Sequence, residues 1–193
     1  LLQAGAEVTA SSDEGVSAMF MPAQFGHAHL VPLLIEAKAD VDQARPADGM
    51  TPLSIASIQG HASTVSVLAS HGADVNRPHG TASLSPLLCA VRCGPPALEV
   101  VQALLAAHAN VNQGIADGAS PLFGACTIPQ PQGSALASAL LEAKADVHQM
   151  IDKPVNGIEP VGSIPLCVAA AAGNAEIVAM LLKAESNVNH RMT

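Results

Sequence analysis

A short phrase recurs through the chain at nearly regular intervals. It reads GAEV at 5–8, KADV at 38–41, GADV at 72–75, HANV at 108–111, KADV at 144–147 and ESNV at 185–188. Its closing valines are separated by 33, 34, 36, 36 and 41 residues. A second phrase lies inside each interval: VSAMF at 16–20, MTPLS at 50–54, LSPLL at 84–88, ASPLF at 119–123 and SIPLC at 163–167. Self-similarity with this period predicts a row of stacked units, because one such unit is too small to bury its own apolar face.

The second unit shows what each unit should contain. Thr51 can cap a helix and Pro52 fits the first turn, where a missing N–H costs nothing. Gly60-His61 ends that helix, and a second helix follows with Val65 and Leu68 on its buried face. Ser120 has the same register as Thr51 and is predicted to be a cap rather than a nucleophile. The equivalent buried pairs are Val31 with Leu34, Val101 with Leu104, Ala137 with Leu140, and Val178 with Leu181.

An extended finger should join each unit to the next. Gly72 stands where a left-handed residue usually ends a helix, and Asp48-Gly49 can turn the finger back. The aspartates of the recurring phrase, Asp40, Asp74 and Asp146, are predicted to accept hydrogen bonds from nearby backbone. We predict left-handed residues at Gly5, Lys38, Gly72, His108, Lys144 and Glu185, and fingers near 10–15, 43–50, 77–84, 113–119 and 149–163.

Residues 43–76, QARPADGMTPLSIASIQGHASTVSVLASHGADVN, resemble the ankyrin family almost throughout. In that family a 33-residue unit carries the string T-P-L-H-x-A. The resemblance covers five successive units and implies an all-α repeat solenoid of helix–turn–helix units with extended finger hairpins. We predict one ankyrin-repeat array over 1–193, with about five repeats and partial repeats at both ends. Leu1-Leu2 align with Leu181-Leu182, so we expect a fragment of a longer protein.

Two segments deviate from the repeated pattern. Pro22 falls near the fifth position of the first helix in the first repeat, where it would remove a hydrogen bond, so that repeat should be distorted. Residues 164–182 are long and apolar enough to imitate a membrane span. Gly173-Asn174 reads as a turn that divides this stretch into two short helices, and we therefore predict no membrane partner.

Composition limits the core, the partner and the compartment. There is no Trp or Tyr, so the core must consist mainly of Ala, Leu, Val and Ile. The formal charge of −8 would repel a phosphate backbone, so nucleic acid is excluded as a partner. The chain opens with no basic segment before an apolar run and contains only four cysteines, so we predict an intracellular, cytoplasmic protein.

The histidines and cysteines do not indicate a metal or cofactor site. His27 and His61 share one register, and equivalent positions in stacked repeats lie about 10 Å apart, too far to converge on one zinc ion. The resemblance places both in inter-helix turns. Cys89 and Cys93 could share a helix face, but buried packing is the favoured interpretation. No phosphate-binding, nucleotide-binding, nucleophile-elbow or zinc-protease motif occurs, so we predict a protein that is not an enzyme.

The resemblance implies that partners bind on a concave surface made of finger tips and the exposed sides of first helices. Two hypotheses follow: a protein-interaction module or scaffold, or the regulatory or substrate-recruiting arm of a larger enzyme. A spacer that binds nothing is a third. Four acidic residues against two basic ones in this set favour a partner with a basic or mixed-charge patch. The set is Asp13, Glu14, Gln24, Phe25, Arg45, Ala47, Asp48, Met50, Ile58, Gln59, Arg92, Cys93, Asp117, Thr127 and Ile128.

Overall fold

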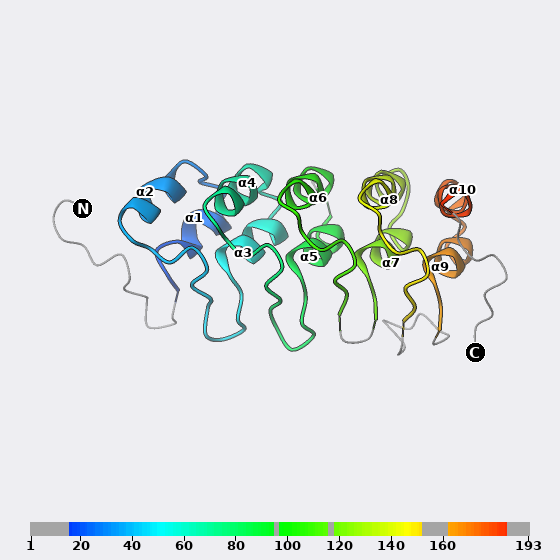
Figure 1. Cartoon of the computed structure of the whole chain (residues 1–193), viewed down its shortest axis with the longest axis horizontal. Coiled ribbons are helices and arrows are strands. Elements are labelled where there is room, and N and C mark those ends of the chain that lie inside the picture. The colour runs from blue at the N-terminus through cyan, green and yellow to red at the C-terminus, as the bar shows by residue number, and fades with distance from the viewer. Residues whose placement is uncertain (1–15, 95–96, 116–117, 152–161, 185–193) are drawn as a thin grey trace. The chain divides into compact units, whose positions relative to one another are not determined.

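The computed structural model describes residues 16–94, 97–115, 118–151 and 162–184, which are coloured in Figure 1. The chain divides into two compact units after Ala109. Within the described residues the secondary structure consists of α-helices and no strand. The first unit contains α1 (Phe20–Gln24), α2 (Leu30–Glu36), α3 (Pro52–Ile58), α4 (Ala62–Ser70), α5 (Pro86–Arg92) and α6 (Ala97–Ala106). The second contains α7 (Pro121–Cys126), α8 (Gln132–Glu142), α9 (Pro165–Ala171) and α10 (Ala175–Lys183).

The helices of each unit form two rows. In the first unit α1, α3 and α5 pack side by side, and α4 packs against both α2 and α6. In the second unit α7 packs on α9, and α8 packs on α10. The described fingers extend from the first-helix row, on the side away from the second helices (Figure 1). The predicted helix–turn–helix units are therefore confirmed, whereas the prediction that they form one array over the whole chain stays a prediction.

The first helices start as their sequences predict. The hydroxyls of Thr51, Ser85 and Ser120 each accept a hydrogen bond from the backbone N–H three residues ahead, and a proline follows each of them. The cap satisfies one of the N–H groups that a helix leaves free at its start. Ser120 is thus confirmed as a cap. In α9 this position holds Ile164, which has no side-chain cap.

The second helices end in the predicted left-handed conformation. Lys38, Gly72, His108 and Lys144 have φ values of 72°, 90°, 63° and 67°. The next residue donates its N–H to a carbonyl near the end of the helix, as Ala39 does to Leu34 and Ala73 does to Leu68. These are the hydrogen bonds of a Schellman motif. The remaining predictions for this position, Gly5 and Glu185, lie outside the described residues.

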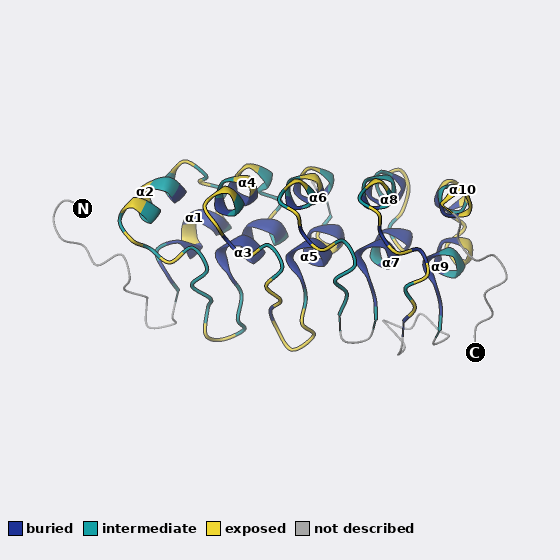
Figure 2. Cartoon of the chain, in the orientation of Figure 1, coloured by how far each residue is buried: buried dark blue, intermediate teal, exposed yellow. Residues whose placement is uncertain are grey.

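The core consists mainly of buried aliphatic residues, and the buried positions lie on both rows of helices (Figure 2). Val65, Leu68, Val101, Leu104, Ala137 and Leu140 are fully buried, as predicted. The prediction was wrong for Leu34 and Val178, which are only half-buried. In α10, Ile177 is fully buried instead, because it lies one helical turn from the buried Leu181.

The first helix of the first repeat is short, and the predicted conflict at Pro22 does not arise. Helix α1 has five residues, against seven in α3 and α5, and starts at Phe20. Pro22 is therefore its third residue rather than the fifth, in the first turn where no N–H is needed. The apolar stretch 164–182 is divided as predicted, because Gly173 has a φ of 70° between α9 and α10. None of the helices in the described ranges has the length and apolarity required to cross a bilayer.

The described fingers close at equivalent positions. The N–H of Arg45 donates to the carbonyl of Met50, and Ile115 donates likewise to Ala119. His79 and Leu84 exchange two hydrogen bonds of 3.0 and 2.9 Å as an isolated antiparallel bridge. These bonds confirm the fingers predicted near 43–50, 77–84 and 113–119. Only the two ends of the finger at 149–163 are described, and the segment 10–15 lies outside the described residues.

Polar side chains in the recurring phrase and directly after it accept backbone hydrogen bonds, some of them from the next repeat. Asp40, Asp74, Asn110 and Asp146 each accept the N–H of the residue two positions ahead, which confirms the prediction for the three aspartates. The side chain of the residue two positions ahead can in turn accept a hydrogen bond from the backbone of the next repeat. The Asp42 carboxylate accepts the Asp74 N–H at 3.0 and 3.2 Å in the first unit, and the Asn112 amide oxygen accepts the Asp146 N–H at 2.8 Å in the second.

The inter-helix turn supplies a second connection. His61 Nε2 lies 3.0 Å from the carbonyl oxygen of Gln24 in the preceding repeat. A carbonyl only accepts, so the tautomer that fits carries the proton on Nε2. Asn174 has the equivalent place in the last repeat and donates from Nδ2 to the carbonyl of Cys126 at 2.9 Å. The structural role predicted for His61 is confirmed, and His27 lies exposed in the same turn of the first repeat.

Candidate partner-binding face

Three residues of the finger at 43–50 and Phe20 of α1 form a compact network. Arg45 donates from Nε to Asp48 Oδ1 at 3.1 Å and from Nη2 to Asp48 Oδ2 at 2.6 Å. The same Oδ1 accepts the N–H of Met50 at 3.1 Å. The guanidinium carbon lies 4.9 Å from the centre of the Phe20 ring, within the range of a cation–π contact. Arg45 therefore stabilises the tip and connects it to α1.

The electrostatics of this tip follow from the Arg45–Asp48 pair. The hydrogen bond from Arg45 lowers the pKa of Asp48, and the Met50 N–H acts in the same direction. The carbonyl of Asp48 also accepts the Gly80 N–H at 2.8 Å, which connects this finger to the finger at 77–84. Arg45 and Asp48 were predicted as partner-binding residues, and the structure shows that each is also held by the other.

Most exposed members of the predicted set lie at the C-terminal ends of first helices. Phe25, the residue that caps α1, is 56% exposed, and Met21, one turn earlier in α1, is 47% exposed. Sequence analysis missed Met21, although its spacing from Phe25 puts both on one helix face. The other exposed members are Ala47, Gln59, Arg92, Cys93 and Thr127, and the half-buried ones are Gln24, Arg45, Asp48, Met50, Ile58 and Ile128.

The predicted charge balance of this set stays a prediction, because the structure describes only one of its four acidic residues. Asp13, Glu14 and Asp117 lie outside the described residues. The remaining charged members are Arg45, Asp48 and Arg92, and the first two are paired with each other. Acidic excess among the described residues lies instead at the base of the fingers.

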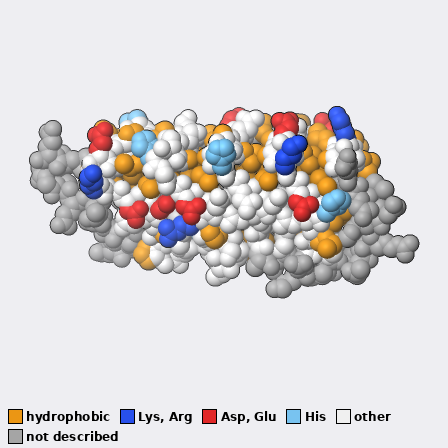
Figure 3. Space-filling view, viewed as in Figure 1, with side chains coloured by type: hydrophobic (Ala, Val, Ile, Leu, Met, Phe, Trp, Pro, Cys, Tyr) orange, Lys and Arg blue, Asp and Glu red, His pale blue; other side chains and the backbone are white. Residues whose placement is uncertain are grey.

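Asp40, Asp42 and Asp74 form this acidic group, with Arg77 beside it. Arg77 donates to the backbone carbonyl of Asp42 at 3.2 Å rather than to its carboxylate. Burial raises the pKa of Asp42, and the negative charges of Asp74 and Asp40 add to this shift. Figure 3 shows acidic side chains gathered beside basic ones near the fingers of the first unit. The scaffolding role predicted for Asp40 and Asp74 is confirmed by the backbone hydrogen bonds that they accept, whereas sequence analysis did not single out Asp42.

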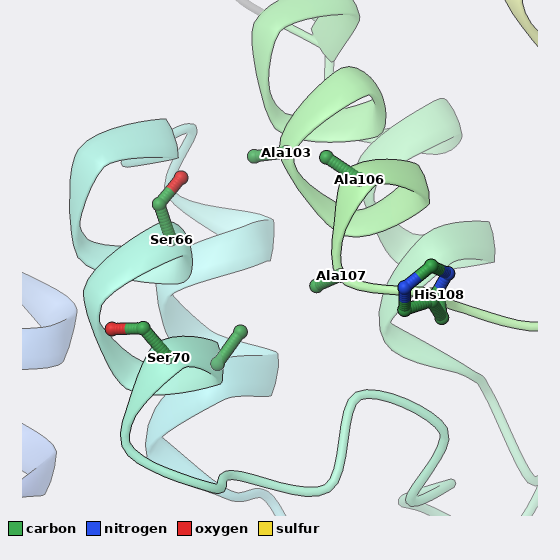
Figure 4. A pocket seen from close by; sticks show the side chains of 7 residues that line it. Ser66, Ser70, Ala103, Ala106, Ala107 and His108 are labelled. Carbon is green, nitrogen blue, oxygen red and sulfur yellow. The ribbon is translucent and has the colours of Figure 1, made fainter.

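A groove of about 370 Å³ lies between α4 and α6 on the second-helix side of the first unit. Small side chains line this groove: Ser66 and Ser70 from α4, and Ala103 and Ala106 from α6 (Figure 4). The two serine hydroxyls donate to carbonyls of their own helix, at 3.0 and 2.8 Å. Because these polar groups are already bonded, they do not converge on a ligand. Ala69, Ala107 and His108 complete the lining.

Two buried thiols, those of Cys89 and Cys126, have little nucleophilic character. Burial raises the pKa of Cys89 to about 12 and that of Cys126 to about 12. The thiolate is the reactive form, so both side chains behave as small apolar groups. Cys93 is exposed, and burial of its sulfur raises its pKa as well. Across the described residues, no three His, Cys, Asp or Glu side chains are arranged to hold a metal ion.

Sequence comparison gives the family to which this architecture belongs. A family model described as ankyrin repeats (3 copies) matches residues 1–79 and 87–192. The chain therefore belongs to the ankyrin-repeat family, and its fold class is the all-helical repeat solenoid. Ankyrin repeats generally mediate protein–protein interactions and are typically non-catalytic. No matching sequence was found among curated proteins.

Proposed function

We propose that this chain is a non-enzymatic interaction module that binds a protein partner through its finger tips and the C-terminal ends of its first helices. The exposure of Phe25 carries this proposal. The chain has three phenylalanines, and the other two, Phe20 and Phe123, are each 1% exposed, whereas Phe25 is 56% exposed. Aromatic side chains are frequent anchors of protein interfaces, because they bury a large area with few rotatable bonds.

Charge supports a partner with a basic or mixed-charge patch rather than a nucleic acid. The chain carries a formal charge of −8, and Asp40, Asp42 and Asp74 concentrate negative charge at the base of the fingers. Such charges accelerate encounter and select partners more than they increase affinity. Binding should therefore weaken as salt rises, because exposed charges are screened beyond about 8 Å at physiological ionic strength.

Two further observations support the remaining parts of the proposal. All four cysteines are free thiols, which suits a reducing, cytoplasmic location. The raised pKa values of Cys89 and Cys126 argue against thiol catalysis by these two residues. These features favour a binding module over a catalytic domain.

The test compares two edges of the first unit. The chain is used to capture a partner, and the affinity of that partner is then measured by titration. Phe25→Ala and Gln59→Arg alter the proposed surface, and we expect each to weaken binding by about tenfold or more. Ser63→Arg and Gln102→Arg alter exposed positions on α4 and α6 and should leave affinity unchanged. Loss of binding in the second pair alone would assign the interaction to the second-helix side.

A further inference from the structure

His79 occupies the position that closes its finger, and its side chain is buried. Its backbone N–H donates to the Leu84 carbonyl at 3.0 Å and its carbonyl accepts the Leu84 N–H at 2.9 Å. The side chain is only 6% exposed. The equivalent residues of the next two fingers, 36 and 72 positions later, are Ile115 and Ile151. A titratable ring therefore lies where two other repeats place an aliphatic side chain.

The surroundings of the ring suit a neutral imidazole. Nε2 lies 3.9 Å from the sulfur of Cys89, a weak hydrogen-bonding group. Nδ1 is buried and has no hydrogen-bond partner. Protonation would turn both ring nitrogens into donors, so one buried N–H would have no acceptor and the other only a sulfur. A buried charge without hydrogen bonds is costly, and the imidazolium would be more stable in water.

Charged groups from the neighbouring finger also act on the ring. The carboxylate of Asp48 favours the imidazolium and the guanidinium of Arg45 disfavours it. Because Asp48 is already hydrogen-bonded to Arg45, its charge is partly compensated. Burial is the largest influence and lowers the pKa of His79 below the ordinary 6.5. The stability of the closed finger is therefore fully present above 6.5 and is lost as the pH falls through the lowered pKa.

We propose that protonation of His79 opens the finger at 77–84 and releases it from the finger at 43–50, so that this part of the chain responds to mild acid. The release follows from position, since Gly80, the residue after His79, donates to the Asp48 carbonyl at 2.8 Å. Movement of the His79 backbone breaks both the bridge to Leu84 and this bond between fingers. Opening is a property of the chain itself, whereas its effect on partner binding rests on the proposed function.

The experiment measures hydrogen exchange of single amides by NMR on the full chain, without a partner, between pH 7.5 and pH 5. Rates are corrected for the intrinsic effect of pH on exchange. For Gly80 and Leu84 we expect the corrected rate to rise below pH 6.5, by up to about tenfold per pH unit, because one proton is linked to opening. The amides of Ile115 and Ile151 serve as internal controls and should show no such rise.

The variant His79→Ile has the isoleucine that occurs at the equivalent positions of the next two fingers. It should abolish the pH dependence of amide exchange at Gly80 and Leu84. An equal rise in this variant would overturn the inference, as would constant protection of Leu84 in the unmodified chain down to pH 5. A second measurement does not depend on the variant. The ring signals of His79 should titrate in step with Leu84 exchange, and titration of the ring while Leu84 stays protected would also overturn it. Because no partner is present, failure here leaves the proposed binding surface untouched.

Discussion

Asp48 is held by Arg45 three residues earlier through two parallel hydrogen bonds, 3.1 and 2.6 Å long, at the tip of the finger at 43–50. The arginine and aspartate side chains are 30% and 32% exposed, so water screens the pair only in part. Asp48 also accepts the Met50 N–H, and its carbonyl accepts the Gly80 N–H. The pair therefore fixes the shape of one finger and its contact with the next.

Replacement of Asp48 by Asn should lower the free energy of unfolding by about 0.5–1 kcal/mol at pH 7, the usual range for a partly exposed ion pair. The pKa of Asp48 is lowered in the folded chain, so its contribution is present above 3.8 and is lost as the pH falls through the folded value. Urea unfolding at pH 7 and pH 3 measures both effects. Arg45→Met completes a double-mutant cycle, and a coupling free energy of zero at pH 7 would contradict the prediction.

Replacement of Asp42 by Asn should stabilise the chain at pH 7 by up to about 0.5 kcal/mol, a typical upper limit for a surface substitution. Asn keeps the acceptor for the Asp74 N–H and removes a carboxylate whose pKa is raised by burial and by Asp74 and Asp40. A raised pKa means that the ionised form is disfavoured in the folded chain. The advantage of Asn should therefore disappear as the pH falls to 3.8, where both side chains are neutral when folded.

The reverse change gives the matched control for this prediction. Asn112 makes the equivalent hydrogen bond to Asp146 in the second unit. Asn112→Asp places a carboxylate beside Asp146 and should lower stability at pH 7. Thermal melts of both variants at pH 7 and pH 3.5 provide the measurement. If both substitutions shifted the melting temperature at pH 7 in the same direction, the two positions would not be equivalent.

Gly26→Ala should be more destabilising than Gly94→Ala. Both glycines end a first helix with positive φ, 74° and 78°, so an added Cβ strains the backbone by about 1 kcal/mol in each. At Gly26 that Cβ would also lie 2.7 Å from His61 Nδ1, whereas at Gly94 nothing lies within 4 Å. Displacement of the ring breaks the His61 hydrogen bond to Gln24, which adds about 1 kcal/mol. Equal losses in denaturant unfolding would exclude this contact.

Glycine should stabilise the ends of second helices that lack it. Lys38, His108 and Lys144 have the same left-handed conformation as Gly72, and a side chain there costs about 1 kcal/mol. We expect Lys38→Gly and Lys144→Gly to raise the free energy of unfolding by somewhat less than this, because the lysine ammonium near a helix C-terminus recovers part of the cost. Gly72→Ala should lower it, since only the backbone opposes that substitution. If the urea midpoint shifted in the same direction for Gly72→Ala as for the substitutions to glycine, the prediction would be refuted.

Local chemistry explains why much of the fold could be predicted from the sequence. A Ser or Thr before Pro specifies a cap through atoms within four residues, and the left-handed position follows from the end of the preceding helix. Thr51, Ser120 and Lys38 therefore adopt the expected geometry without reference to distant residues. The position of Pro22 was predicted less well, because the helix could start two residues later and remove the conflict.

The candidate site depended on contacts that the sequence does not display. Arg45 and Asp48 were identified as exposed charges, yet their side chains meet across a turn and Arg45 also lies over Phe20 from another repeat. His79 looks like any finger residue until its burial against Cys89 is known. Exposure of Phe25 agreed with the prediction, because the C-terminal end of a first helix is open to solvent whichever residue stands there.

The two surfaces by which a repeat contacts its neighbours carry different polar groups. His61 and Asn174 donate backward to the preceding repeat, whereas Asp42 and Asn112 accept from the following one. Such a head-to-tail interface has no built-in limit to the number of units, in contrast to a self-complementary one. A duplicated repeat can join the row without orphaned polar groups when its turn supplies a donor and its recurring phrase an acceptor. At the junctions where they occur, these polar side chains therefore favour particular pairs of repeats as neighbours.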